Sequence, residues 1–384
     1  MSDLARTRDI LRDLIAFPTV SSDSNLDMID YLAGRLGDLG ARLDIFHDET
    51  GKKANLFATI GPDADGGILL SGHTDVVPVT DQNWSHDPFE MVAQDSRLYG
   101  RGACDMKGFI AAVLAKAPTF KDRVSTRPLH FSFTYDEETG CIGAGNLAED
   151  LIEKGVRPAI AIIGEPTSMR IIEGHKGCYE YSTHFHGLEG HGSAPDAGVN
   201  AVEYAVRYVA HLIELKSELQ SRAPDNSRFQ PPWTTVNVGG LSGGVAHNVI
   251  ASHAQVDWEM RPVQSADATF VKDSLRALCR DQLLPAMRAV FPEAAIKLET
   301  IGEVDGLEPT DDNLAREIVA ELTGANSADT VAFGTEAGIF QKLGMDVVVC
   351  GPGSIDQAHK ADEFVSEDQL EQCLTMLERL SQKL

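Results

Sequence analysis

The sequence has few cysteines, and none of them forms a Cys-x-x-Cys pair. The six are scattered over 384 residues at Cys104, Cys141, Cys178, Cys279, Cys350 and Cys373. Isolated cysteines of this kind are typical of reduced thiols, so we expect a cytoplasmic protein without a cysteine-based structural zinc site.

Long apolar runs, a secretion signal and an excess of positive charge are also missing. No run of about 18 apolar residues occurs, which predicts that the chain has no membrane span. The first residues lack the apolar region of a signal peptide. The sequence holds 33 basic and 58 acidic residues, a net charge of −25, so nucleic acid and anionic membranes are not expected partners.

The composition is otherwise that of a globular protein, with 43% hydrophobic and 24% charged residues. A chain of 384 residues exceeds the size of one compact core, so two domains are expected.

The most informative stretch is residues 69–78, Leu-Leu-Ser-Gly-His-Thr-Asp-Val-Val-Pro. Its apolar start predicts a buried strand, and His73 and Asp75 follow where ligands bind in α/β proteins. A neutral imidazole there suits zinc, and a nearby carboxylate can orient it. Alone, the pair is a weak signal and favours the simpler interpretation, a strand followed by a capped turn.

Other acidic residues stand in similar places. Asp105 lies in a glycine-rich loop before the predicted helix 109–117, where it is either a ligand or a helix cap. Three carboxylates including Glu137 and Glu138 follow the predicted strand 129–135, and Glu165 follows the predicted strand 159–163. Adjacent carboxylates repel each other, so we expect either a positive group beside them or protonation of some of them.

The element order changes after residue 177. Between residues 178 and 295 the pattern predicts strand-helix-strand-strand-helix-strand, the ferredoxin-like order. We therefore expect an α/β protein in which residues 1–177 and 296–384 form a mixed-sheet catalytic domain. Residues 178–295 would form an inserted α+β domain.

Histidine and carboxylates without thiolates suit a catalytic zinc, cobalt or manganese site. The candidates, two histidines and several carboxylates, supply five ligands, which is more than one tetrahedral ion with an open position can take. They suit two ions about 3.5–4 Å apart that share a carboxylate.

These motifs together resemble the M20 metallopeptidases over nearly the whole chain. The resemblance rests on four segments and two histidines: His-Thr-Asp at 73–75, Gly-Arg-Gly-Ala-Cys-Asp-Met-Lys-Gly at 100–108, Asp-Glu-Glu-Thr-Gly at 136–140, Gly-Glu-Pro-Thr at 164–167, His191 and His359. Residues 175–177 and 351–359 are most similar to the acetylornithine deacetylase branch.

The resemblance implies roles for individual residues. His73 and Glu165 would bind one metal ion, Glu138 and His359 would bind the other, and Asp105 would bridge them. The implied cofactor is two Zn²⁺ per subunit, with Co²⁺ as an alternative. Asp75 would orient His73. Glu137 would be the general base, although from the residues alone Glu137 and Glu138 are interchangeable.

The resemblance also implies how substrate is handled. His191, from the inserted domain of a partner subunit, would donate to the tetrahedral oxyanion, which implies a homodimer with the inserted domain as its dimerisation and lid domain. Arg261 would bind a substrate carboxylate, with Asn248 and Thr335 as further contacts. Two simpler alternatives remain open: His191 as a loop histidine without a catalytic role, and Arg261 as a plain ion pair. Glu336, in the same loop as Thr335, is an alternative contact for a substrate ammonium.

The implied reaction is hydrolysis of N-acetyl-L-ornithine to L-ornithine and acetate, in arginine biosynthesis. The alternatives are a succinyl-diaminopimelate desuccinylase, an acetylcitrulline deacetylase or a broader hydrolase of N-acyl amino acids. A metal-binding regulatory protein without catalysis is the alternative from another class.

Overall fold

A computed structural model describes residues 1–384 as two compact units. The first unit comprises Met1–Gly174, Pro309–Thr330 and Thr335–Leu384, and the second comprises His175–Glu308 and Val331–Gly334. The second unit therefore extends past residue 295, where the sequence pattern had ended it. The reason is the strand β14 (Ala295–Val304), which pairs with β9 (Cys178–His186) along its length.

The first unit contains an eight-stranded mixed sheet in the order β1-β2-β6-β3-β7-β16-β8-β15. Its strands are β1 (Arg42–His47), β2 (Ala54–Ile60), β3 (Ile68–His73), β6 (Leu129–Thr134), β7 (Ile160–Pro166), β8 (Ile172–His175), β15 (Asp329–Val331) and β16 (Asp346–Gly351). Neighbours in the central run β6-β3-β7-β16 are parallel, so their carboxyl ends meet at one edge.

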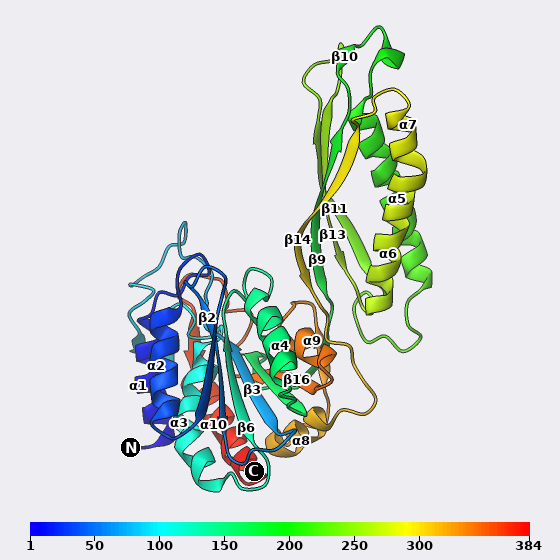
Figure 1. Ribbon diagram of the computed structural model, residues 1–384. Coiled ribbons are helices and arrows are strands. Elements are labelled where there is room, and N and C mark those ends of the chain that lie inside the picture. Colours follow the sequence, from blue (N-terminus) through cyan, green and yellow to red (C-terminus); the bar gives the residue numbers. More distant parts are fainter. The chain divides into compact units, whose positions relative to one another are not determined.

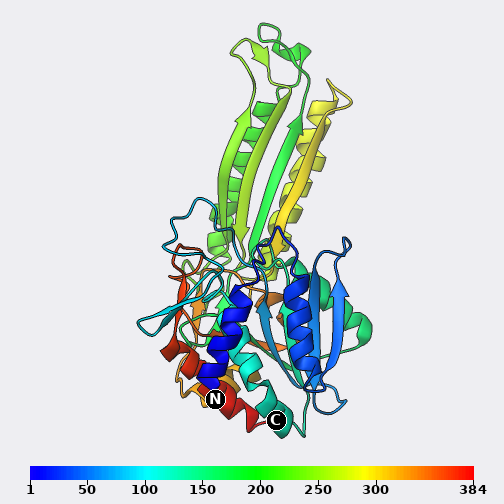
Figure 2. The same cartoon turned by 90° about the vertical axis from the view of Figure 1, so that its left-hand side faces the viewer.

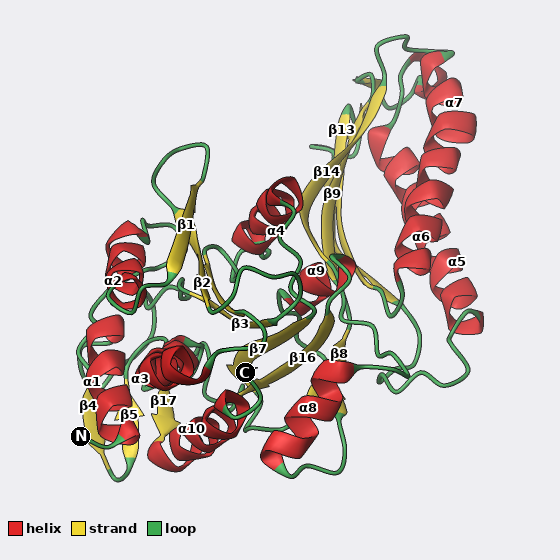
Figure 3. Cartoon of the chain, turned by 60° about the horizontal axis from the view of Figure 1, so that its bottom comes forward, coloured by secondary structure: helices red, strands yellow, loops and turns green.

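Helices cover both faces of this sheet (Figure 3). One face carries α1 (Asp3–Ile15), α2 (Leu26–Gly37), α3 (Lys107–Arg123), α8 (Leu314–Thr323) and α10 (Glu367–Ser381). The other carries α4 (Ile142–Lys154) and α9 (Ala337–Lys342). Helix α3 is buried on almost all sides because it lies between the sheet and the helices α1 and α10, which explains its alanine-rich sequence.

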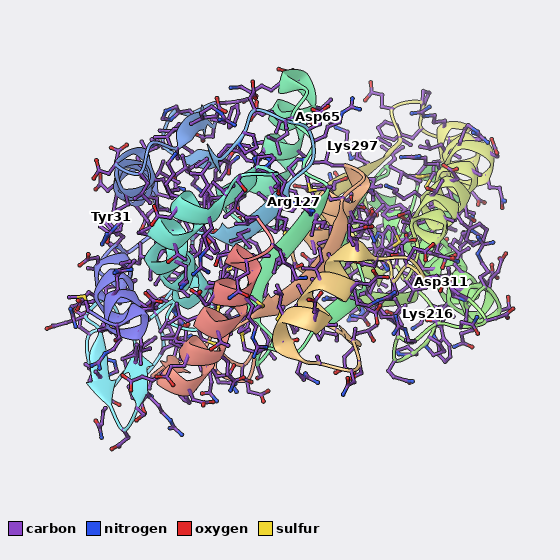
Figure 4. The ribbon with its side chains drawn as sticks, turned by 90° about the horizontal axis from the view of Figure 1, so that it is seen from below. Tyr31, Asp65, Arg127, Lys216, Lys297 and Asp311 are labelled. Carbon is purple, nitrogen blue, oxygen red and sulfur yellow. The ribbon has the colours of Figure 1, made fainter.

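The sequence pattern predicted the main elements but missed several shorter ones. Helix α1 begins after Ser2, whose side chain accepts the N–H of Ala5, as an N-cap does. Tyr31 of α2, labelled in Figure 4, donates to Asp13 of α1 at 2.8 Å and ties the two helices at the outer edge of the unit. Helix α4 was not predicted.

The segment 80–99, predicted as a loop, contains two short strands. They are β4 (Val92–Gln94) and β5 (Arg97–Tyr99), and they form a three-stranded sheet with β17 (Phe364–Ser366). This sheet brings the chain before Asp105 beside the chain after His359.

The second unit is a four-stranded antiparallel sheet in the order β11-β13-β9-β14. Its remaining strands are β11 (Thr235–Gly243) and β13 (His253–Arg261), and its helices are α5 (Ala201–Ser221), α6 (Ser265–Leu278) and α7 (Leu284–Arg288). The helices lie on one face, and the other face has none (Figures 1 and 2). The strand order and connections are ferredoxin-like, so the predicted α/β class with this inserted α+β unit is confirmed.

One predicted helix of the second unit, over residues 266–286, is interrupted. A π-helical turn, Cys279–Leu283, separates α6 from α7. Pro285 lacks the N–H that a continuous α-helix would donate to the carbonyl of Asp281, which explains the break. No helix in the structure has the length and apolarity that crossing a membrane requires.

Candidate metal centre

The predicted ligand residues of the first unit converge at the carboxyl edge of its sheet. His73 is the last residue of β3, Glu165 is the penultimate residue of β7, and Glu137 and Glu138 come shortly after β6. The residue before Glu165 has to be glycine, because a Cβ at Gly164 would stand 2.0 Å from the ring of Phe109. Parallel strands therefore assemble residues that are distant in sequence.

His73 faces two carboxylates. Its Nδ1–H donates to the backbone carbonyl of Asp75 at 2.9 Å, so the neutral ring has a bare lone pair at Nε2. That Nε2 lies 3.0 Å from Oδ1 of Asp105 and 3.7 Å from Oε1 of Glu165. Acceptors facing each other at these distances need a proton or a cation between them.

The other oxygen of Asp105 faces the second histidine. Oδ2 of Asp105 lies 3.3 Å from Nε2 of His359, and Oε2 of Glu138 lies 3.0 Å from the same nitrogen. Asp105 thus stands between the two histidines, with one oxygen toward each. The five residues predicted as ligands are brought together in one unit.

Burial and mutual repulsion shift the protonation of this cluster. Burial, with repulsion from Asp105, raises the pKa of Glu165 well above its ordinary value. Hydrogen bonds to Asp105 and Glu138 raise the pKa of His359 to about 10. Burial lowers the pKa of His73, but the carboxylates of Glu165 and Asp105 raise it by a larger amount. The resulting pKa lies well above the ordinary value. The site as a whole attracts positive charge.

These residues fit divalent metal ions. Ligand atoms of two overlapping sets lie within 4.8 Å of one another: His73, Asp105 and Glu138, and His73, Glu137 and Glu165. Metal–ligand bonds of about 2.0–2.2 Å in a tetrahedron place neighbouring ligand atoms roughly 3.3–3.6 Å apart, close to the separations found here. Oε1 of Glu165 is buried without any hydrogen-bond partner, as a ligand oxygen without its ion would be.

Asp75 does more than the predicted orientation of His73. Its carboxylate oxygen lies 3.6 Å from Nδ1 of His73, while its backbone carbonyl takes the closer contact. The carboxylate accepts the backbone N–H groups of Glu137 at 3.0 Å and Glu138 at 3.3 Å, and the hydroxyl of Ser21 at 2.6 Å. Asp75 therefore holds the turn that carries both glutamates.

The three consecutive acids have different partners. Asp136 is paired with Nζ of Lys53 at 2.5 Å, and Glu138 with His359. The carboxylate of Glu137 accepts only a weak contact from Sγ of Cys141 at 3.4 Å. The positive groups expected beside the acidic run are thus present, and Glu137 has the least engaged carboxylate of the three.

Two residues of the 334–336 loop are buried in the first unit and do not line an open site. Thr335 is 1% exposed, and its hydroxyl accepts the N–H of Ala337 at the start of α9. Glu336 is fully buried and accepts the hydroxyls of Ser71 at 2.5 Å and Thr134 at 2.8 Å. Both carboxylate oxygens of Glu336 are thus engaged inside the first unit, which argues against the alternative contact with a substrate ammonium. The sequence signal that could have indicated this buried contact is Ser71, a polar residue inside the buried strand β3.

The remaining predicted residues belong to the second unit. His191 lies in β10 (Gly190–His191), which pairs with β12 (Val249–Ile250), and Gly192 donates to the carbonyl of Asn248 at 2.7 Å. His191 and Asn248 are thus neighbours, both exposed. The N–H of Ser193 donates to Nδ1 of His191 at 3.2 Å, so the neutral ring carries its proton on Nε2, as a donor.

Arg261 lies at the opposite end of the second unit's sheet from His191. Its guanidinium is ion-paired with Glu259 at 2.9 Å. A substrate carboxylate would have to displace Glu259 from it. The strand β13 spans nine residues from His253 to Arg261, about 26 Å, which far exceeds a small N-acyl amino acid.

An α/β sheet with two histidines and several carboxylates at its carboxyl edge defines a metallopeptidase-type hydrolase. Residues 69–383 match the peptidase family M20/M25/M40, and the chain belongs to that family. Two curated relatives are acetylornithine deacetylases, from Photorhabdus laumondii (37% identity, 93% of this chain and 91% of the relative) and Pasteurella multocida (35%, 96% and 95%).

Solved structures share the fold. An M20 family metallo-carboxypeptidase from Sulfolobus solfataricus superposes with a TM-score of 0.72 at 17% identity, covering 100% of this chain and 99% of that one. The YXEP protein of Bacillus subtilis, a dinuclear metal-binding peptidase of the M20 family, gives 0.64 at 17% identity, covering 99% and 98%.

Proposed function

We propose that the protein is a two-metal amidohydrolase that removes the acetyl group from N-acetyl-L-ornithine to give L-ornithine and acetate, in arginine biosynthesis. The observation that carries the proposal is Asp105, which presents one oxygen to His73 and the other to His359. The substrate follows from relatives that share 35–37% identity and bear the name acetylornithine deacetylase.

In the proposed centre, His73 and Glu165 would hold one ion, Glu138 and His359 would hold the other, and Asp105 would be a ligand of both. Two zinc ions, or cobalt in their place, would polarise the acyl carbonyl and acidify the attacking water. Glu137 takes the proton from that water and later gives it to the leaving amine. Its loosely engaged carboxylate suits this role, whereas Glu138 is occupied by His359.

The second unit supplies the other groups. Nε2–H of His191 would donate to the oxyanion of the tetrahedral intermediate, and Arg261 and Asn248 would contact the substrate. Arg261 ends β13, whereas His191 lies beside β12, just before the start of β13; β13 itself is about 26 Å long, so one copy of the unit cannot present both residues to one small substrate. This supports a homodimer in which the second unit serves as dimerisation and lid domain and one of the two residues comes from the partner subunit. We propose that this homodimer is cytoplasmic, as the scattered, unpaired cysteines predict. Thr335 is the third proposed substrate contact, and its hydroxyl accepts the N–H of Ala337 in this structure.

The test is hydrolysis by the zinc- or cobalt-loaded protein of N-acetylornithine, N-acetylcitrulline, N-succinyl-diaminopimelate and a set of other N-acetyl amino acids. We expect kcat/KM to be highest for N-acetylornithine. Preference for another member would identify one of the rival hydrolases. Two bound ions without any hydrolysis would favour the metal-binding regulatory alternative.

A further inference from the structure

Two segments that are 258 residues apart in sequence lie side by side next to the proposed metal centre. The first precedes Asp105 and the second follows His359. They are joined where β5 pairs with β17, since Tyr99 is opposite Phe364 and the N–H of Gly100 donates to the carbonyl of Glu363 at 2.9 Å. Each segment carries one proposed ligand.

The side chain of Glu363 holds the first segment. It is 1% exposed, and its Oε1 accepts the backbone N–H groups of Cys104 at 2.8 Å and Asp105 at 3.1 Å. Its Oε2 accepts the N–H of Gly102 at 3.2 Å and a guanidinium N–H of Arg101 at 2.6 Å. All its contacts thus go to the loop that ends in Asp105.

Arg101 extends the connection to the second segment through Gln82. The guanidinium is 1% exposed, lies 5.0 Å from the ring of Trp84 and donates to Oε1 of Gln82 at 2.5 Å. The side-chain amide of Gln82 donates in turn to the backbone carbonyl of His359 at 2.9 Å. A continuous chain of hydrogen bonds therefore runs from the backbone of Asp105 to the backbone of His359.

His359 needs such support more than His73 does. His73 belongs to a central strand and is 1% exposed, whereas the side chain of His359 is 52% exposed. The backbone of His359 also has φ +61°, a left-handed conformation that costs a non-glycine residue free energy and persists only when its surroundings hold it.

We propose that Gln82, Arg101 and Glu363 are positioning residues that brace His359 against Asp105 and so determine how tightly the Glu138/His359 position binds its ion. The inference rests on the proposed two-ion function and adds to it that the two ion positions differ in how their ligands are held. The ion held by His73 and Glu165 depends less on the brace, because strands hold both of these residues and the brace reaches that ion only through the shared Asp105.

The experiment uses two variants and one matched control. Glu363→Gln removes the buried charge, and Gln82→Met removes the hydrogen bonds of a half-buried side chain without changing its length much. Glu173→Gln is the control, because Glu173 is also 1% exposed and also pairs with an arginine, Arg316, at 2.6 Å. Zinc is titrated calorimetrically into chelator-treated protein, and the melting temperature of the metal-free protein is measured alongside.

We expect the unaltered protein and Glu173→Gln to bind two ions alike. Gln82→Met should bind one ion normally and the second about 10- to 100-fold more weakly, the usual effect of losing an outer partner of a metal ligand. Glu363→Gln should weaken the second ion more than the first, which it reaches only through Asp105. The turnover of both variants should recover at excess zinc. If Glu363→Gln does not fold, Gln82→Met decides the question. Affinities unchanged in Gln82→Met, or both ions weakened equally, would overturn the brace, while failure of the unaltered protein to bind two ions would overturn the proposed function itself.

Discussion

Glu137 and Glu138 are adjacent and chemically identical, yet the proposed mechanism gives them different work, and paired substitutions separate the two roles. Glu137→Gln and Glu138→Gln each replace one carboxylate by an amide of the same size. Asp75 holds the backbone N–H groups of both residues, so neither change should move the turn. Any change in metal affinity or turnover can then be attributed to the loss of the carboxylate.

The magnitudes follow from the contacts. Loss of a general base slows a reaction by about 10²–10⁴-fold, which corresponds to roughly 2.7–5.4 kcal/mol in the activation free energy. The carboxylate of Glu137 has only the contact with Cys141, so Glu137→Gln should leave metal affinity within a few-fold of normal. Oε2 of Glu138 faces His359 at 3.0 Å. Glu138→Gln should therefore weaken one ion by more than the roughly 10- to 100-fold typical of an outer partner.

Two measurements made on both variants check this expectation. One is zinc stoichiometry and affinity by calorimetry, and the other is acetate release from N-acetylornithine at saturating zinc. Full metal occupancy with turnover lost is expected for Glu137→Gln, and reduced occupancy for Glu138→Gln. The reverse pattern would show that the two residues exchange roles. Near-normal turnover of Glu137→Gln would remove it from the mechanism.

Further predictions concern the second unit, pH and metal. His191→Ala should lower kcat far more than it changes KM, and a change confined to KM would contradict the oxyanion role. Arg261→Gln should raise KM with little change in kcat, whereas Glu259→Gln, which frees the arginine, should not raise it; equal effects would indicate a structural ion pair. Burial lowers the pKa of His130 to about 4, below its unfolded value of about 6.5. Stability from this group is therefore complete above pH 6.5 and is lost as the pH falls to 4, by roughly 3 kcal/mol, and denaturant unfolding of His130→Gln should lack that loss. Adding zinc to chelator-treated protein at 100 times its Kd should raise the unfolding free energy by about 2.7 kcal/mol for each ion bound, and an unchanged melting temperature would argue against binding to the folded state.

The exposed side chain of His191 contacts Ser193, and this contact provides a control for the prediction on His191→Ala. The hydroxyl of Ser193 lies 2.7 Å from Nδ1 of His191. Ser193→Ala removes that contact but leaves the backbone donor, so it should reduce turnover less than His191→Ala does. It serves as a control for general disturbance of the β10 loop.

Local pattern was enough to predict much of this protein. The apolar run ending at His73, the strands before Glu137 and Glu165, and the helix after Asp105 are each specified by neighbours in the chain, through alternation, glycine and helix-start signals. The ferredoxin-like order of the second unit was readable for the same reason. Short strands such as β4 and β5 were missed because three residues carry too little periodicity, and they exist because β17, far along the chain, pairs with them.

Tertiary structure alone decided the pairings. Whether Glu138 or Glu137 faces His359, that Asp75 holds the turn of both, and that Glu336 lies under the strands between Ser71 and Thr134 all depend on the sheet order and on segments up to 265 residues apart. Glu363 gave no signal in the sequence, because a single acid before a short strand has no distinctive context. Its role arises only where the loop of Asp105 folds over it. The residues' chemistry is a property of the chain, but the partner that each atom meets is a property of the fold.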